Sequence, residues 1–454
     1  MDMNRRDAIK LGALGVAAAT ATTLTGCVGG EAQPSGASSA RNVLGKHQIV
    51  VIGGGFGGLT VAKGLKKKDS KFDVLVIEKN DTFMACPFSN TYLGKLDGID
   101  LGTFVRDYNQ PSAAHGYGVL KTEVTNIDRK AKEIHTAAGI VQYDILVMAP
   151  GIDYNYESTI PGITKAQIAD LKRQAPGALI PGSEHVTLER NLVNMEDGDV
   201  VITVPAGKFR CPPAPFERAC MIAAYMKKEE IPGKVIILNP GAKVAKGAAF
   251  KEAWKELHGD RIVHMENCKL TSVDTKAQTI SFNQKGAGAK THKYSVLNLI
   301  PNNKANSVIE MSGVETVTGF GKVVMNGCSF QTKTDADIYA VGDVVGHAIP
   351  PSGQTAIWAG GQCVEEIAHR LHGKPYELAV KTETQSASNV CFSMVGDKPE
   401  EAIRVYHDFS WVADKNIIKG KGRVPKAASG KFRDKGTAKA TRDWFRGVMA
   451  DLFS

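Results

Sequence analysis

One segment restricts the fold of this chain more than any other, because an apolar run, a glycine-rich turn and a helical pattern follow one another directly. The run is Ile49 to Ile52, the turn carries Gly53, Gly55 and Gly58, and Glu78 closes a second apolar run. Glycines at this spacing let backbone amides approach a pyrophosphate at a helix N-terminus, and an acid about twenty residues later accepts a ribose hydroxyl. The segment predicts a dinucleotide site on a parallel α/β sheet.

Three later segments indicate which dinucleotide is bound. Residues 143–151 resemble the strand and turn that follow the first half of an FAD domain, and residues 337–343 resemble the second FAD motif, whose Asp bonds the ribityl chain. A predicted helix, 357–371, then points the positive end of its dipole at the pyrimidine ring of the flavin, where reduction places negative charge. The candidate FAD-contacting residues in these segments are Ala149, Gly151, Asp343, Gln354 and Thr355. The motifs and their order predict FAD.

The middle of the chain opens with a similar strand, 198–204, but lacks the glycine-rich turn. The residues that follow are rich in proline, which removes the amide donors that a pyrophosphate needs. Nicotinamide binding is therefore not expected, and the flavin must exchange electrons with another partner. Cys211 lies in this turn, where an isolated Cys is ordinarily a buried structural thiol. Arg210 is expected either to lower the pKa of Cys211 or to pair with Glu217.

The N-terminus predicts export. Arg5 and Arg6 precede a short Gly/Ala-rich stretch, which resembles a twin-arginine signal, and Leu24 to Cys27 resembles a lipobox that would place a lipid anchor on Cys27. Residues 1–27 are assigned to this signal and residues 28–45 to a linker. The predicted location is periplasmic, where disulfides can persist.

The net charge of +9 comes from one late segment, 415–446, which holds eleven Lys or Arg and two Asp, so the rest of the chain is balanced. This segment could steer an acidic partner, lie against anionic lipid headgroups, or be a solvated insertion. Aromatic residues are sparse in it, which argues against nucleic acid. No Cys/His cluster has the spacing of metal ligands. No run of 18 or more apolar residues follows the N-terminus.

Two stretches, 86–94 and 210–217, resemble the flavoprotein subunit of flavocytochrome c sulfide dehydrogenase, and the resemblance extends from the export signal to the aromatic C-terminus. It implies that Cys86 is joined covalently to the flavin through its sulfur. It also implies that Cys211 is half of a redox-active disulfide, which accepts sulfide sulfur and passes electrons to the flavin. A c-type cytochrome subunit would be the electron acceptor, with Glu217 a candidate proton acceptor for hydrogen sulfide.

The chain departs from this family at the second cysteine. The resemblance places that cysteine about twenty residues before Asp343, where this chain has Val323, and the nearest thiol is Cys328. Five extended residues span up to about 17 Å, so Cys328 is not automatically equivalent. Either a rearranged loop pairs Cys328 with Cys211, or Cys211 forms a persulfide alone, or the sulfide activity is altered or lost. The other cysteines of the body are expected in the core: Cys220, Cys268, Cys363 and Cys391.

The predicted architecture is α/β, with two Rossmann-like domains and a C-terminal α+β region. An FAD domain split between 46–165 and 296–375 encloses a second such domain, 166–295, and residues 376–454 cap the flavin or dock the partner. The predicted function is sulfide oxidation to persulfide or polysulfide sulfur, with electrons passed to a c-type cytochrome. The alternatives are a sulfide:quinone oxidoreductase, although the late segment has no sustained apolar stripe for a bilayer, and a flavin-binding accessory protein without turnover.

Overall fold

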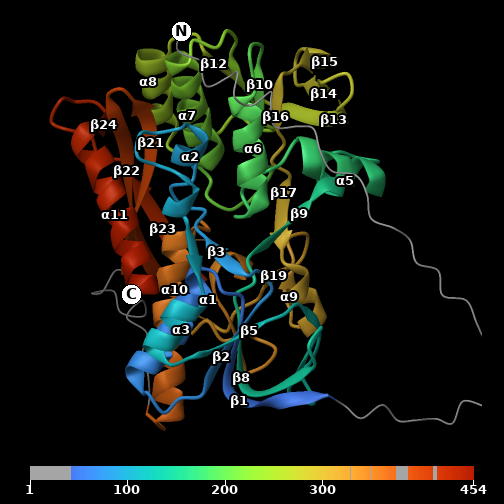
Figure 1. The fold of residues 1–454 in the computed structure, drawn as a ribbon, viewed down its shortest axis with the longest axis vertical. Coiled ribbons are helices and arrows are strands. Elements are labelled where there is room, and N and C mark those ends of the chain that lie inside the picture. Colours follow the sequence, from blue (N-terminus) through green and yellow to red (C-terminus); the bar gives the residue numbers. More distant parts are fainter. Residues whose placement is uncertain (1–41, 328, 348, 375–386, 413–416) are drawn as a thin grey trace, which may run out of the picture. The chain divides into compact units, whose positions relative to one another are not determined.

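The computed structural model describes residues 42–327, 329–347, 349–374, 387–412 and 417–454 (Figure 1). The predicted export signal, the lipobox and most of the predicted linker lie outside these residues. The first described strand, β1 (Val43–Ile52), begins inside the segment assigned to the linker and pairs with β8 from Val43 onward, with a shift of register between Val43 and Gly45. Part of the segment assigned to the linker is therefore a strand of the first sheet.

The first sheet is built around β1 and has the order β5-β2-β1-β8-β7-β6, with β20 beside β8. Its other strands are β2 (Val74–Glu78), β5 (Gly118–Lys121), β6 (Val124–Asp128), β7 (Glu133–Thr136), β8 (Ile140–Met148) and β20 (Ile338–Ala340). The strands β5, β2, β1, β8 and β20 are parallel. Their near-continuous apolar runs are typical of parallel strands that are buried on both faces. The predicted α/β class is confirmed.

Two helices from distant parts of the sequence pack together beside this sheet, α1 (Phe56–Lys68) and α10 (Gly353–Leu371) (Figure 1). Helix α10 begins after Ser352, whose hydroxyl accepts from the Thr355 amide at 3.1 Å. A hydroxyl at this position satisfies one of the amides that a helix N-terminus leaves unpaired. The late part of the chain thus returns to the first sheet.

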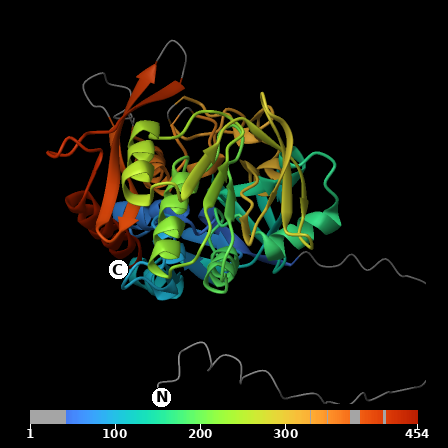
Figure 2. The same ribbon diagram turned by 90° about the horizontal axis from the view of Figure 1, so that it is seen from above.

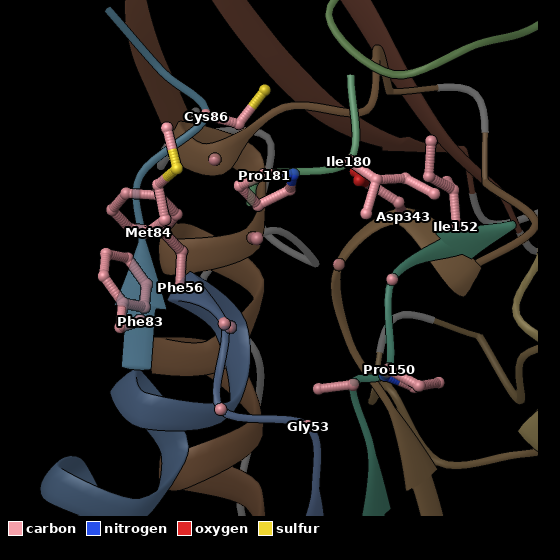
Figure 3. Close-up of a pocket in the computed structure, with 18 of the residues that line it drawn as sticks. Gly53, Phe56, Phe83, Met84, Cys86, Pro150, Ile152, Ile180, Pro181 and Asp343 are labelled. Atoms are coloured by element: carbon pink, nitrogen blue, oxygen red, sulfur yellow. The ribbon is translucent and has the colours of Figure 1, made fainter. Parts of the chain in front are cut away.

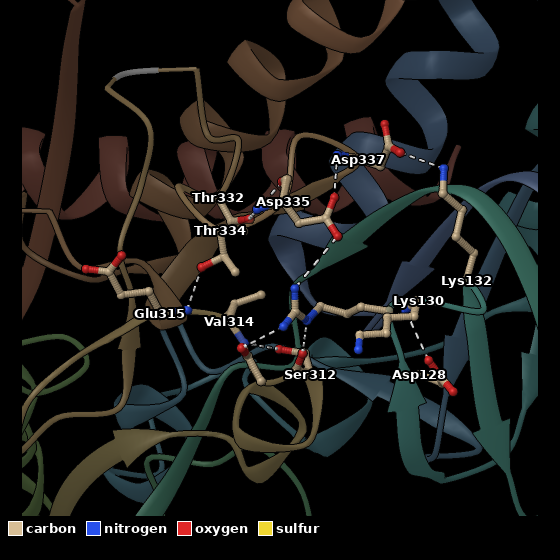
Figure 4. A network of polar contacts seen from close by, with 12 residues as sticks. Asp128, Lys130, Lys132, Ser312, Val314, Glu315, Thr332, Thr334, Asp335 and Asp337 are labelled. Atoms are coloured by element: carbon tan, nitrogen blue, oxygen red, sulfur yellow. Dashed lines mark hydrogen bonds and ion pairs between the residues drawn. The ribbon is translucent and has the colours of Figure 1, made fainter.

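A polar network fixes the strand β20 to the early part of the chain (Figure 4). Arg129, in the turn between β6 and β7, donates to the carbonyl of Ser312 at 2.5 Å and faces Asp335 at 3.9 Å. Lys132, in the same turn, donates to Asp337 at 2.5 Å. Asp337 directly precedes β20, so these ion pairs hold that strand against β8.

A second parallel sheet, of order β12-β11-β10-β16, occupies the middle of the chain. Its strands are β10 (Val200–Thr203), β11 (Val235–Leu238), β12 (Ile262–Met265) and β16 (Val296–Asn298). The helix α7 (Ala214–Lys228) follows β10, as expected for a Rossmann-like unit. An antiparallel meander, β13 (Cys268–Asp274), β14 (Thr279–Gln284) and β15 (Gly288–Lys293), comes next, and the pair β9 (Ile152–Asn155) and β17 (Asn302–Ala305) joins the two halves.

The smaller elements complete the described chain. The remaining strands are β3 (Thr82–Met84), β4 (Val105–Asp107), β18 (Thr316–Val317) and β19 (Lys322–Val323). The remaining α-helices are α2 (Asn90–Leu93), α3 (Asn109–His115), α4 (Tyr156–Thr159), α5 (Lys165–Gln174), α6 (Ser183–Val193), α8 (Gly247–Ala253) and α9 (Ser307–Ser312). Short turns of helix are η1 (Leu101–Thr103), η2 (Trp254–His258) and η3 (Gly342–Val344).

The C-terminal region is an antiparallel sheet with a long helix. The strands are β21 (Ala387–Asp397), β22 (Glu400–Val412), β23 (Ile417–Arg423) and β24 (Arg433–Asp434), and the helix is α11 (Lys435–Phe453). In Figure 2 the red strands lie beside the yellow-green helices, and α7 and α8 do contact β21. This contact brings β21 close to the turn that carries Cys211.

An apolar side of the C-terminal helix begins at the end of the late basic segment, 415–446, and continues beyond it. Helix α11 buries Phe445, Met449, Leu452 and Phe453 along one side. The ring of Phe445 lies 5.0 Å from that of Phe88, between centroids. The apolar side of α11 is therefore covered by the protein itself. None of the helices in the described ranges has the length and apolar character needed to cross a bilayer.

Three histidines, of which His185 and His258 are buried and His347 is half-buried, should make the fold sensitive to acid. Burial lowers the pKa of His185 to about 3 and the pKa values of His258 and His347 to about 4, from an ordinary 6.5. The unfolded chain binds these protons at a higher pH than the folded chain does. Their contribution to stability is therefore complete above pH 6.5 and is lost as the pH falls toward 4.

Between pH 6.5 and 4, each of these histidines should lower the free energy of unfolding by up to about 1.4 kcal/mol for each unit by which the pH falls. Denaturant unfolding at a series of pH values measures the slope. Replacing His258, whose Nε2 donates to the Val395 carbonyl at 2.8 Å, by Gln should make the slope shallower by about one proton. An unchanged slope in His258→Gln would contradict this explanation.

Candidate functional site

A cavity of about 840 Å³ opens at the carboxyl ends of the parallel strands of the first sheet. In open α/β sheets, ligands bind at this edge. Figure 3 shows its walls, with one apolar side and an opposite side that carries a carboxylate. The labelled residues are Phe56, Phe83 and Met84 on the first side, Pro150, Ile152 and Asp343 on the second, Gly53 between them, and Cys86, Ile180 and Pro181 at the far end.

The glycine-rich turn has the shape that a dinucleotide requires. A Cβ on Gly53, which has φ +103°, would lie 2.4 Å from the Ala149 carbonyl oxygen, and a Cβ on Gly58 would lie 1.9 Å from that of Gly53. Gly55, by contrast, faces open space and lines the cavity. Gly53 and Gly58 are thus required for packing, whereas Gly55 leaves room for a ligand at the start of α1.

Replacing Gly55 by Ala should therefore separate cofactor binding from folding. The added methyl group meets no protein atom within 4 Å, so the unfolding midpoint of the apoprotein should not change. It would occupy the space where a pyrophosphate approaches the helix, and FAD affinity should fall by about tenfold or more. Gly447→Ala, on the exposed side of α11, is the matched control and should retain full FAD content. Full FAD affinity in Gly55→Ala would refute this role.

Glu78 lies at the end of β2 and lines the cavity. Its carboxylate accepts from the Gly54 amide at 2.6 Å and from the amide and side chain of Asn80 at 2.8 and 2.6 Å. The predicted ribose acceptor therefore also holds the glycine-rich turn. Ala149 and Gly151 line the cavity at the end of β8, as the segment 143–151 predicts.

Asp343 gives the clearest indication of a ligand. It is 7% exposed in η3, and one of its carboxylate oxygens pairs with the Arg210 guanidinium. The other, Oδ1, is buried and has no hydrogen-bond partner among the residues that the structure describes, although Asp343 lines the cavity. A buried unpaired carboxylate oxygen is costly, and a ribityl hydroxyl would satisfy it. The cavity, the open glycine and this oxygen all fit FAD.

The N-terminus of α10 also meets the cavity. Gln354 lines it and accepts from the Trp444 indole at 3.0 Å, so α11 helps to fix this end of α10. Thr355 and Gly58 do not line it. Thr355 is 2% exposed and donates to the Pro350 carbonyl at 2.9 Å. Its role in this structure is to hold the turn rather than to contact a ligand.

Three cysteines line the same cavity: Cys86, Cys211 and Cys391. Cys86 follows β3 and its thiol donates to the Leu179 carbonyl at 3.3 Å. Cys211 has φ +49°, a left-handed conformation that is uncommon outside glycine. Cys391 comes from β21 and is half-buried. The expectation that Cys391 belongs to the core is therefore wrong, and this residue is the one that the sequence reasoning missed.

Cys211 and Cys391 lie between the same two parts of the structure, the turn before α10 and the side chain of Glu217. On one side is the turn before α10, where the Cys211 amide donates to the Pro351 carbonyl at 2.8 Å and Asn389 donates to Thr355 at 3.3 Å. On the other side is Glu217, whose Oε1 accepts from the Met394 amide at 2.8 Å. Glu217 is six residues beyond Cys211, and Asn389 and Met394 flank Cys391 in β21. The two thiols are therefore held close together.

The electrostatics of the thiols agree with this placement. Burial raises the pKa of Cys211 well above its ordinary value, and among charged neighbours Cys391 contributes most to this rise, followed by Glu217 and Cys86. Burial also raises the pKa of Cys86, and Arg210 opposes that rise. The expectation that Arg210 lowers the pKa of Cys211 or pairs with Glu217 is not met, because Arg210 pairs with Asp343.

Glu217 is 6% exposed in the first turn of α7. Its second oxygen, Oε2, accepts from Asn90 at 3.1 Å. Burial raises the pKa of this carboxyl, which brings it closer to the range in which it can exchange protons. Glu217 lines the cavity, so the structure brings this predicted residue together with Cys211.

The expected location of the second cysteine does not reach the cavity. Val323 is fully buried in β19, and the described lining contains no residue between Met311 and Val341. Cys328 lies outside the described residues. Cys220, Cys268 and Cys363 are buried in the core, as expected.

The turn after β10 offers a pyrophosphate few free amides. The Ala206 and Arg210 amides donate to Asn302 and Asn303, at 2.6 and 2.9 Å. The first turn of α7 contains Pro215, and its other amides bond to carbonyls of the turn itself. The absence of nicotinamide binding in the middle domain stays a prediction. Among the residues that the structure describes, no group of three or more His, Cys, Asp or Glu could hold a metal ion.

Comparisons with known proteins identify the relatives of this chain. The family model for the central part of the sulfide dehydrogenase (flavocytochrome c) flavoprotein chain matches residues 185–301. The model for the flavin-binding part of flavocytochrome c sulphide dehydrogenase matches residues 383–453. Residues 47–178 match the pyridine nucleotide-disulphide oxidoreductase family.

Individual proteins agree with these matches. The flavoprotein chain of the Chlorobaculum thiosulfatiphilum sulfide dehydrogenase is 48% identical over 46 residues, which are 10% of this chain and 96% of that sequence. The mitochondrial sulfide:quinone oxidoreductase of Mus musculus is 24% identical over 310 residues, and the match spans 65% of this chain and only 65% of the length of that relative.

The fold is similar to that of the sulfide:quinone oxidoreductase of Aquifex aeolicus, with a TM-score of 0.68 at 14% identity over 89% of this chain and 91% of that one. Two of the three matching family models describe parts of the flavocytochrome c sulfide dehydrogenase flavoprotein. The Chlorobaculum relative, which is 48% identical over the matched residues, is a protein of the same name. The chain therefore belongs to the family of flavocytochrome c sulfide dehydrogenase flavoproteins, and its cofactor is FAD.

Proposed function

We propose that this protein oxidises sulfide at a pair of cysteines beside FAD and passes the electrons to a c-type cytochrome in the periplasm. The observation that carries the proposal is that Cys211 and Cys391 line the cavity in which FAD fits. The relatives named for sulfide support the substrate. The bound FAD supplies a two-electron acceptor.

The two cysteines form the reactive couple. In their oxidised form, hydrosulfide attacks one sulfur of the Cys211–Cys391 disulfide, that S–S bond breaks, and a new S–S bond forms to the incoming sulfur. One cysteine then carries a persulfide and the other leaves as a thiolate, so charge and atoms balance. Oxidation of this persulfide and thiolate to a trisulfide link releases the two electrons that FAD accepts. A disulfide sulfur needs no prior loss of a proton, which suits a site where burial raises the pKa of Cys211. Cys391 thus replaces Cys328 as the proposed partner of Cys211.

Two further residues have proposed roles at this site. Glu217 takes the proton released when hydrogen sulfide becomes hydrosulfide, because its carboxyl lies beside the couple and its pKa is raised by burial. Cys86 lines the same cavity and is proposed to join the flavin covalently through its sulfur. Export by a twin-arginine signal and a lipid on Cys27 remain proposals from the sequence.

Anaerobic titration of the holoprotein with sulfide tests the function. Sulfide should remove the visible absorbance of the oxidised flavin, whereas NADH should leave it unchanged. Retention of the yellow colour with sulfide would instead indicate an accessory protein without turnover.

The electron acceptor requires a separate experiment, because the similarity to sulfide:quinone oxidoreductases favours a quinone. Against a quinone stands α11, whose apolar side packs on the protein and is not free for a bilayer. We therefore expect the sulfide-reduced protein to reduce cytochrome c faster than a short-chain ubiquinone. Reduction of the quinone alone would assign the protein to the quinone-reducing class.

A further inference from the structure

A lysine approaches the cysteine pair from outside the FAD cavity. Lys246 directly precedes α8 and is half-buried, and it is not among the residues that line the cavity. Its ammonium group donates to the Ser393 hydroxyl at 3.0 Å. Ser393 is fully buried in β21, two residues beyond Cys391. Because side chains alternate along a strand, Ser393 and Cys391 lie on the same face of β21.

The register supports this arrangement. The irregularity of β21 comes only after Met394, so the alternation holds from Cys391 to Ser393. The helix α8 also packs on β21, which places the start of α8 beside this part of the strand. Lys246 has φ +57°, a left-handed conformation that costs free energy for a residue other than glycine. Cys211 has the same kind of conformation, so the two strained residues of this site are a thiol and a cation.

The charge of Lys246 acts on the same groups. Burial raises the pKa of the Cys211 thiol and of the Glu217 carboxyl, and Lys246 lowers both. A cation that favours the ionised forms of these groups also favours an incoming anion at the same place.

We propose that Lys246, held by Ser393, forms the entrance subsite that attracts the hydrosulfide anion to the Cys211–Cys391 pair. This inference rests on the proposed function. Lys246 is not among the residues that line the cavity, so its charge acts on the pair from the side of α8. Lys246 also stabilises the thiolate that leaves when the disulfide opens. It is a positioning residue, since it acts on the reaction through its charge.

Alkylation of Cys211 by two reagents of different charge tests the subsite without turnover. The holoprotein is first reduced with dithiothreitol and then treated with iodoacetate, an anion, or iodoacetamide, which is neutral. Peptide mass spectrometry measures the rate at Cys211. In Lys246→Met the ratio of the iodoacetate rate to the iodoacetamide rate should fall by about tenfold, since the attraction for the anion is lost. Lys246→Arg should retain the ratio.

Lys243→Met is the matched control, because Lys243 lies in the same loop and is exposed. An unchanged ratio in Lys246→Met, or an equal fall in Lys243→Met, would overturn the inference. Sulfide kinetics give a second readout, in which Lys246→Met should raise the half-saturating sulfide concentration more than it lowers the limiting rate. A lower limiting rate with unchanged half-saturation would indicate a purely structural role.

The two proposals fail in different ways. If sulfide does not bleach the flavin of the unaltered protein but the alkylation ratio still depends on Lys246, sulfide oxidation is wrong and the anion subsite stands. If sulfide bleaches the flavin but the alkylation ratio is the same with and without Lys246, the proposed function stands and the anion subsite is wrong.

Discussion

Cys211→Ser should bind FAD normally but lose sulfide-dependent flavin reduction, by on the order of a thousandfold or more. Cys211 lines the cavity, and its sulfur is half of the proposed couple. A serine hydroxyl fits the same left-handed backbone but forms no disulfide or persulfide. Anaerobic stopped-flow mixing with sulfide measures the rate, and the visible spectrum reports FAD content.

Cys391→Ser should show a similar loss, since each half of the couple is required. Cys268→Ala is the matched control, because Cys268 is buried in β13, away from the cavity. A Cys391→Ser protein that reduces its flavin at the normal rate would show that Cys211 works alone or with another thiol.

The second large effect concerns stability. Arg218 is 1% exposed in α7 and donates to four acceptors, which are the side chains of Asn90 and Asn298 and the carbonyls of Gly177 and Ala178, at 2.6–3.0 Å. It thereby joins α2, the second sheet and the segment before α6. Arg218→Met would leave three of these buried acceptors unpaired, since the Gly177 carbonyl also accepts from Asn298 at 3.0 Å. This loss should lower the free energy of unfolding by about 3–5 kcal/mol.

Denaturant unfolding of the holoprotein measures this loss. Arg446→Met is the control, because Arg446 is exposed on α11 and pairs only with Asp443, a neighbour one turn away. It should leave the unfolding midpoint unchanged. Equal midpoints for Arg218→Met and the unaltered protein would show that water or rearranged side chains satisfy the acceptors.

Local sequence was sufficient to predict the FAD side of the site. The turn at Gly53, the strand end at Ala149 and the turn at Asp343 each follow a buried strand, and parallel strands place their carboxyl ends at one edge. The lining of the cavity by these three residues therefore follows from three short motifs. Gly58, which the same motif assigns to the ligand, instead packs against Gly53 and does not line the cavity.

The sulfur side could not be predicted in this way. Cys391 lies in a strand of apolar and polar residues that reads as an ordinary core strand, and no local motif marks it. Only the packing of β21 on α7, through the contact between Glu217 and Met394, brings it to Cys211. The resemblance to a family directed attention to Val323 instead, which the structure buries in another sheet.

Helix α11 is a different case, because its signal was present. Ala438, Thr441, Phe445, Met449 and Leu452 recur at steps of three and four residues, which is the spacing of a helix with one buried face. The many basic residues between them concealed this pattern. Charge on the exposed side of a helix does not argue against an apolar stripe on the other.

Peptide mass spectrometry of the holoprotein before and after one equivalent of sulfide, without reductant and without oxygen, tests the central claim most directly. The account predicts a peptide pair linked through Cys211 and Cys391 before treatment. After treatment, the two cysteines should together carry one additional sulfur atom, as a persulfide on one of them while the flavin is still oxidised, or as a trisulfide link between them once two electrons have passed to the flavin. Two unmodified thiols at these positions, both before and after sulfide, would contradict the account.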